Sequence, residues 1–231
     1  MAGIDTKAKV VLHMDDVGLT DSSLSPKTVT LNGSISRSST QSKFGGYSAV
    51  LNGTTDWLSL ADSEDWNFGT GDFTLEGWFY WNGSQNTGLF AQYESALNRM
   101  FCQLLSTGSL NFYAMVSNSV KAYYFTAAGA VSSGAWKHIA YVRNGSNFYI
   151  FVDGVSQSLT VSTAISTNDL GNMATTFGIG GSANLGNFFN GYIDEVRISK
   201  GEARWTSNFT PPTSAYSIDT ATSNTLSMMG V

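Results

Sequence analysis

Two adjacent acidic residues near the end of the chain, Asp194 and Glu195, are the first candidates for chemistry. They lie within "YIDEV" (192–196), an otherwise apolar and alternating segment that is typical of a β-strand. A catalytic acid and base must share one site, whereas neighbouring side chains of a strand point to opposite faces. The alternation therefore predicts that these carboxylates form no catalytic pair, and it leaves open why an acid interrupts the strand.

Other catalytic groupings are not indicated. His13 and His138 are the only histidines, which is too few for a zinc site built from several of them. No Gly-x-Ser-x-Gly motif is present, and the glycines Gly178 and Gly180 are not followed by a helical pattern, so a phosphate-binding loop is not expected. A Ser-His-Asp triad stays open at this point, because it is recognised by geometry and not by spacing, but no motif favours one.

The composition favours strands over helices and excludes some partners. Only 13% of the 231 residues are charged, 13% are aromatic, and there are 24 glycines but three prolines. A net charge of −5 without a basic cluster argues against binding to nucleic acid. No apolar run approaches the roughly 20 residues that cross a bilayer, and "MAGIDTKAKVVLHMDD" (1–16) lacks the apolar core of a signal peptide.

Alternating runs separated by turn residues predict about a dozen strands, and thus two antiparallel sheets packed face to face. Asn144-Gly145 and Asp153-Gly154 supply the turns of a three-stranded meander that begins at Trp136. A single helical turn is predicted for "KGEARW" (200–205). The other expected strands are 10–14, 48–51, 57–60, 73–81, 88–93, 100–106, 110–117, 121–126, 176–179 and 191–199.

The chain is expected to hold one domain, because no linker or shift of composition divides residues 10–212. Residues 1–9 would be an N-terminal extension, and residues 213–231 a Ser/Thr-rich polar tail. That tail has too few large apolar residues to fold alone. We expect it to dock onto an adjacent subunit of a homo-oligomer, for which a trimer is the first arrangement to test, or onto a larger particle.

Aromatic residues offer two interpretations. The segment "FTLEGWFYW" (73–81) places Trp78 and Tyr80 on the face opposite to its phenylalanines, and Tyr123 lies in a second aromatic run. Most of these rings are expected in the core, since aromatic residues dominate burial energetics. Trp78, Tyr80 and Tyr123 are alternatively candidates for a platform on which sugar rings stack.

Four phrases, in this order, resemble one family: "VVLHMDD" (10–16), the stretch from "FGGYSAVLNG" to "FTLEGWFYW" (44–81), "WKHIAYVRNGSNFYIFVDG" (136–154) and "GYIDEVRISKGEARWTSNFTPPT" (191–213). Together they are similar to the laminin-G-like branch of the concanavalin A-like lectin/glucanase superfamily, and most similar to the versions in bacteriophage virion proteins, tail fibres especially. The resemblance implies a jelly-roll sandwich of two curved antiparallel sheets. It also implies a location on a virion or an extracellular surface, with other virion proteins and host-surface carbohydrate as partners.

The resemblance also implies a structural Ca²⁺ site where the first and last strands meet. Its ligands would be Asp15 or Asp16, a backbone carbonyl of Gly45 or Gly46, and Asp194. Calcium takes six to eight oxygen ligands, which carboxylates, carbonyls and water supply. The alternative is that Asp194 accepts hydrogen bonds from a turn or pairs with Arg197.

Glucanases of the same superfamily carry a Glu-x-Asp-x-x-Glu strand, whose alternation brings two carboxylates to one face. None of the five glutamates of this chain has that spacing. The expected function is therefore a non-catalytic binding or structural module of a phage particle, in a tail fibre or as a decoration protein. A glycoside hydrolase of the same fold, or a purely structural protein without a ligand, are the alternatives.

Overall fold

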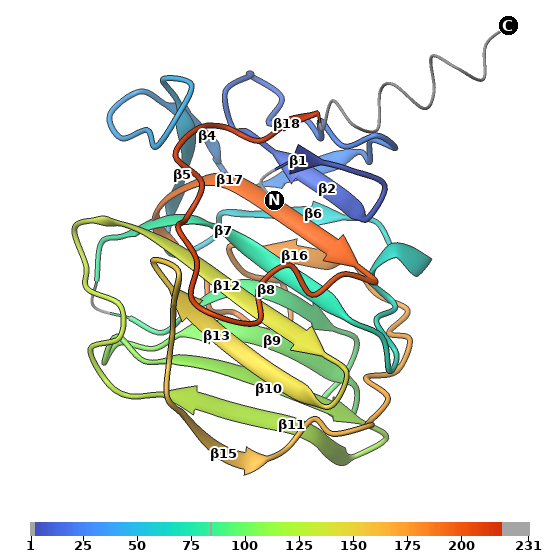
Figure 1. Cartoon of the computed structure of the whole chain (residues 1–231). Helices are drawn as coiled ribbons and strands as arrows, with labels where there is room; N and C mark the ends of the chain where they lie inside the picture. The colour runs from blue at the N-terminus through green and yellow to red at the C-terminus, as the bar shows by residue number, and fades with distance from the viewer. Residues whose placement is uncertain (1–2, 84, 219–231) are drawn as a thin grey trace, which may run out of the picture.

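Two antiparallel β-sheets, each of eight strands, pack face to face in the computed structural model of the chain (Figure 1). It describes residues 3–83 and 85–218. The only helix in these ranges is a single 3-10 turn, Glu64–Trp66. The predicted all-β jelly-roll sandwich is confirmed.

The first sheet, called the β10 sheet, is fully antiparallel, and its order mixes strands from the middle and the beginning of the chain. In spatial order its strands are β15 (Leu159–Thr163), β11 (Ser119–Thr126), β10 (Leu110–Val116), β9 (Arg99–Leu104), β8 (Thr87–Tyr93), β16 (Phe177–Ile179), β6 (Trp57–Leu60) and β3 (Val29–Asn32).

The second sheet, called the β7 sheet, carries the predicted meander at one end. In spatial order its strands are β14 (Val155–Ser156), β13 (Asn147–Val152), β12 (Trp136–Asn144), β7 (Phe73–Trp81), β17 (Asn190–Lys200), β5 (Ser48–Asn52) and β4 (Ser36–Ser38). The eighth strand, β2 (Ala8–Leu12), pairs with the second half of β17, whereas β5 pairs with the first half.

The core lies between the sheets and follows the alternation of the strands. On β7, Phe73, Leu75 and Phe79 are buried in it, as the sequence pattern predicts. The opposite face of β7 carries Glu76 and Trp78, which are also buried. This second burial requires something outside the sandwich to cover the β7 sheet.

The cover is the segment that follows β17, residues 201–218, which we call the C-terminal strap. It crosses the outer face of the β7 sheet, drawn in red in Figure 1, and ends in β18 (Ser217–Ile218). Trp205 and Phe209 of the strap pack on Ala140 and Phe151 of the sheet. Its last strand pairs in parallel with β1 (Gly3–Ile4), so both ends of the described chain meet there.

The strap changes two expectations. No helical turn forms at residues 200–205, because Arg204 and Trp205 are held in an extended path by side-chain contacts with Asp5 and Glu76. The described part of the polar tail, 213–218, lies on its own domain, and Tyr216 is buried there. The rest of the tail, where docking to another subunit was expected, lies outside the described residues.

Across residues 3–83 and 85–218, no helix is long and apolar enough to span a membrane.

Candidate functional site

A β-bulge in β17 decides where Asp194 and Glu195 point. Asp194 is paired with Trp78 of β7, and Arg197 with Glu76, so two residues of β17 lie opposite Gly77 alone. Glu195 has a φ of 48°, in the left-handed region that non-glycine residues rarely adopt. The bulge interrupts the alternation, and Glu195 reaches Tyr216 on the same outer side as Arg197. The prediction of opposite faces was therefore wrong at this point.

Asp194 is fully buried and binds the loop that precedes β5. One carboxylate oxygen, Oδ2, accepts hydrogen bonds from the backbone N–H groups of Lys43 and Phe44, at 2.8 and 3.2 Å. The other oxygen, Oδ1, accepts from the N–H of Glu195 at 2.9 Å. No lysine, arginine or histidine among the described residues pairs with this carboxylate.

Asp15 approaches the same loop from the end of the first long strand. Its Oδ1 accepts a hydrogen bond from Tyr47 N–H at 3.3 Å. Gly45 has a φ of 65°, and a Cβ there would lie 1.8 Å from Asp15 Oδ2, so only glycine fits beside this carboxylate. Asp15, Gly45 and Asp194, three of the residues named as metal ligands from the sequence, thus lie around one loop.

The remaining predicted ligands lie differently. Gly46 is in the same loop, also at positive φ, and a Cβ added to it would meet no atom within 4 Å. Asp16 is exposed and turns away to the N–H and hydroxyl of Thr20. His13, two residues before Asp15, instead contacts Glu195, whose carboxylate raises the pKa of His13.

Asp194 is a buried carboxyl group without a cationic side chain beside it among the described residues, and a bound cation would stabilise its ionised form. Burial raises the pKa of this carboxyl group to about 7, with further contributions from Glu195 and Asp15, although two backbone N–H groups oppose the shift. Within the described ranges no three His, Cys, Asp or Glu side chains gather as a metal-binding group. A calcium ion would therefore take Asp15 and Asp194 as its only carboxylates here, and complete its shell with backbone carbonyls and water.

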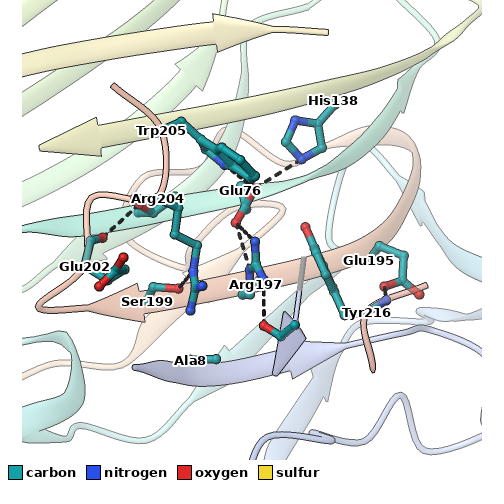
Figure 2. A network of polar contacts seen from close by, with 12 residues as sticks. Ala8, Glu76, His138, Glu195, Arg197, Ser199, Glu202, Arg204, Trp205 and Tyr216 are labelled. Atoms are coloured by element: carbon teal, nitrogen blue, oxygen red, sulfur yellow. Dashed lines mark hydrogen bonds and ion pairs between the residues drawn. The ribbon is translucent and has the colours of Figure 1, made fainter. Parts of the chain in front are cut away.

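Glu76, on the neighbouring strand, has a complete set of partners (Figure 2). Arg197 Nη2 and Nε donate to Glu76 Oε1 at 2.6 and 2.8 Å. Trp205 Nε1 of the strap donates to Oε2 at 2.9 Å, and His138 Nε2 lies 3.3 Å from the same oxygen. Burial alone would raise the pKa of Glu76, but the charge of Arg197 lowers it overall.

The strap closes this network from outside. Tyr216 places its ring 4.3 Å from the guanidinium carbon of Arg197, and its backbone N–H donates to Glu195 Oε2 at 2.9 Å. Figure 2 shows Tyr216 standing between Arg197 and Glu195. Arg197 Nη1 also donates to the carbonyl oxygen of Gly3, at 2.9 Å. The network therefore joins β7, β17, the first strand and the strap.

Beside the Asp194 loop, the strap leaves a cleft of about 480 Å³ on the outer face of the β7 sheet. Its walls are Lys43 and Phe44 of the loop and residues 210–213 of the strap. The remaining lining residues are Trp78, Trp136 and Asp153. The cleft is shallow and open to solvent, and its aromatic walls and few polar groups can contact one face of a small ligand.

The predicted sugar-stacking residues divide between two surfaces. Trp78 lines the cleft, but only 6% of the residue is exposed, and the ammonium group of Lys43 lies 3.8 Å from its ring centre. Tyr80 is half-buried and contacts Trp136 edge to face. Trp136, which is half-buried and lines the cleft, therefore offers more accessible ring than Trp78.

Tyr123 lies on the β10 sheet, in the register of Tyr113 and Phe101, which form an aromatic row across β11, β10 and β9. Lys43, Trp136 and the strap were not recognised from the sequence as parts of one cleft. The sequence held one indication that a segment covers this face of the sheet. Glu76 and Arg197 are charged residues within apolar strands, and a buried charge requires a partner.

The Laminin_G_3 family, described as the concanavalin A-like lectin/glucanases superfamily, matches residues 52–206. No curated protein matches the chain significantly. Among solved structures, the chain is similar to domain 4 of AbnA, a GH43 extracellular arabinanase from Geobacillus stearothermophilus, solved in complex with arabinotriose. The TM-score is 0.62 at 20% identity, and the alignment covers 85% of this chain and 94% of that domain.

Botulinum neurotoxin binding domains are also similar. The domain of serotype D/C VPI 5993 gives a TM-score of 0.62 at 12% identity and covers 85% of this chain and 49% of that one. The serotype C1 domain gives 0.61 at 11% identity, with 99% and 53% covered. This chain thus spans about half the length of those domains, and such identities show the fold alone. The family match extends over more than half of the 231 residues, and the chain belongs to the concanavalin A-like lectin/glucanase superfamily.

Proposed function

We propose that the protein is a non-catalytic carbohydrate-binding module of a phage particle, in a tail fibre or as a decoration protein, and that it binds host-surface glycan in the cleft beside Trp136. The observation that carries the proposal is this cleft, which combines aromatic side chains with polar groups and is built on the Asp194 loop. The arabinotriose bound by a domain of the same fold supports a sugar as the ligand.

Calcium supports the cleft in this proposal. Asp15 and Asp194, with backbone carbonyls of the loop that contains Gly45, would hold the ion. Bound there, it would supply the positive charge that Asp194 lacks and fix the loop. The backbone N–H groups of Lys43 and Phe44 donate hydrogen bonds to Asp194, and both residues line the cleft. A loop that is fixed by calcium would therefore also fix one wall of the cleft.

The absence of catalysis is supported by the placement of the acids. Glycoside hydrolysis usually requires two carboxylates that flank the bond. Among the residues that line the cleft, Asp153 is the only acid. Glu76 lies under the strap, with no exposed surface and in an ion pair with Arg197. Neither acid has a second carboxylate available on the substrate side.

A glycan-array experiment with the full chain, followed by titration calorimetry on the glycans retained, tests the proposal. We expect binding without release of reducing ends, and a loss of affinity of about tenfold for Trp136→Ala, the contribution of one aromatic contact. Tyr123→Ala, on the opposite sheet, is the matched control and should bind normally. Binding that is lost in Tyr123→Ala but kept in Trp136→Ala would overturn the cleft as the site.

The particle assignment rests on the sequence resemblance and has its own test. Mass spectrometry of purified virions should detect the protein in several copies per particle. Many copies would suit a weak single site, because linked sites raise avidity without new contacts. Its presence only in the medium or on the bacterial surface would contradict the virion role.

A further inference from the structure

The cleft contains two charged side chains, and only one of them is neutralised. Asp153 is paired with Lys137, whose Nζ lies 2.8 Å from Oδ2, and its Oδ1 accepts the backbone N–H of His138 at 3.0 Å. Lys43 has no ion-pair partner among residues 3–83 and 85–218. In a chain with a net charge of −5, this cleft therefore presents one uncompensated positive charge.

Lys43 is held in place although it lacks an ion pair. Its backbone N–H is bound by Asp194, and its ammonium group lies 3.8 Å from the ring centre of Trp78 and 5.5 Å from that of Phe44. Cation–π contacts of this kind restrain a side chain that otherwise loses much rotamer freedom on binding. Trp78 thus positions a cation and leaves Trp136 as the ring that a sugar can contact.

The other polar groups of the cleft leave Lys43 as its main charged contact for a ligand. The indole nitrogens of Trp78 and Trp136 have no acceptor in the described part of the chain, but both are buried and do not face the cleft opening. The carboxylate oxygens of Asp153 are already occupied by Lys137 and the backbone. A site with an unpaired cation and without a free carboxylate complements a ligand that brings negative charge.

We propose that the cleft selects a sugar that carries a carboxylate, a uronic or a sialic acid, through an ion pair with Lys43 while the sugar ring packs on Trp136. A single cation matches one negative charge, whereas a phosphate ester carries about two at neutral pH. This inference rests on the proposed function, because it names the class of glycan that the same cleft would bind.

The test compares acidic glycans with neutral counterparts on the full chain by titration calorimetry. Trigalacturonate is paired with its carboxyl-reduced form, and 3′-sialyllactose with lactose, so that the two arms distinguish the two sources of a sugar carboxylate. We expect one acidic member to bind at least about tenfold more tightly than its neutral partner, as for a hydrogen bond to a charged group. The preference should shrink as salt is added.

Three variants locate the effect. Lys43→Gln should remove the preference for the acid, whereas Lys43→Arg should keep most of it. Lys121→Gln makes the same change of charge on the β10 sheet, where Lys121 has no ion pair within the described residues, and should leave the preference intact. An equal loss in Lys43→Gln and Lys121→Gln would mean a general effect of charge and would overturn the inference.

The failure of this inference differs from the failure of the proposed function. Equal binding of acidic and neutral glycans, still weakened about tenfold by Trp136→Ala, would overturn the selectivity for a carboxylate and leave the cleft as a neutral sugar site. Binding that does not respond to Trp136→Ala would overturn the cleft itself, and the inference with it. Circular dichroism of each variant shows that a loss of binding is not a loss of fold.

Discussion

Glu76 and Asp194 are two fully buried carboxylates on neighbouring strands of the same sheet. Their surroundings differ in whether they supply a positive charge to balance the carboxylate. Glu76 faces the guanidinium of Arg197, and its pKa is lowered. Among the described residues, Asp194 receives hydrogen bonds from backbone N–H groups alone, and burial raises its pKa to about 7. A buried charge needs a partner. The comparison shows one site that is complete within the chain and another that is suited to a partner from outside.

The largest expected effect comes from breaking the complete site. Glu76→Ala leaves the charge of Arg197 buried without this carboxylate, which costs about 3–5 kcal/mol of unfolding free energy. Urea denaturation followed by tryptophan fluorescence measures it. The matched control is Glu64→Ala, since within residues 3–83 and 85–218 the exposed Glu64 carboxylate is hydrogen-bonded only to the side chains of Asn67 and Asn172. A double variant, Glu76→Leu with Arg197→Met, should recover much of the loss, and equal stability of Glu76→Ala and wild type would contradict this role of the ion pair.

The addition of calcium, as a partner for Asp194, should have the next largest effect on the free energy of unfolding. Calcium that binds only the folded protein stabilises it by about 2.7 kcal/mol at a hundredfold excess over its dissociation constant. Thermal melts in calcium and in chelator measure the shift. Asp194→Asn should abolish the response, and Asp16→Asn should keep it because Asp16 turns to Thr20. A wild-type melting temperature that is the same in calcium and in chelator would contradict the calcium site.

A smaller effect is expected from pH in metal-free buffer. Because its folded pKa is raised from 3.8 to about 7, Asp194 holds a proton in the folded state that the unfolded state has released. Stability should therefore fall as pH rises between about 4.5 and 6.5, by on the order of 2 kcal/mol once solvent near the loop is allowed for. Below this window Glu76 and Asp5, with lowered pKa values, act in the opposite direction, and above it His13 begins to lose its proton.

Urea midpoints at several pH values check this slope. Asp194→Asn should flatten it, since the amide does not titrate. Saturating calcium should reverse it, because a metal-bound carboxylate is ionised and protons compete with the metal. A slope that is unchanged in Asp194→Asn would assign the pH dependence to another group.

The regular parts of the fold could be predicted from the sequence. The apolar alternation of β7 and the turns of the β12–β14 meander are local signals, and the structure confirms both. The strands that were missed, β3, β4 and β15 among them, are short or polar and lie at or near the ends of their sheets, where one face is not buried. Without a buried face they carry no apolar alternation.

The candidate site was predictable only in part. The residue types at Asp15, Gly45 and Asp194 were recognised through the family resemblance, and the structure brings them together. The bulge at Glu195 was not, because a non-glycine residue at positive φ has no local sequence signal. Nor could the cover over Glu76 be foreseen, since Trp205 of the strap, which contacts it, is more than a hundred residues away in the sequence.

The pairing of β1 with β18 has a mechanical consequence. The two strands run parallel, so the chain enters β1 at one end of the pair and leaves β18 at the other. A pulling force applied through the two ends therefore acts along the strands, in shear, and loads their hydrogen bonds together instead of opening them one at a time. The contacts of Arg197 with Gly3 and of Glu195 with Tyr216 lie directly behind the pair and would share that load.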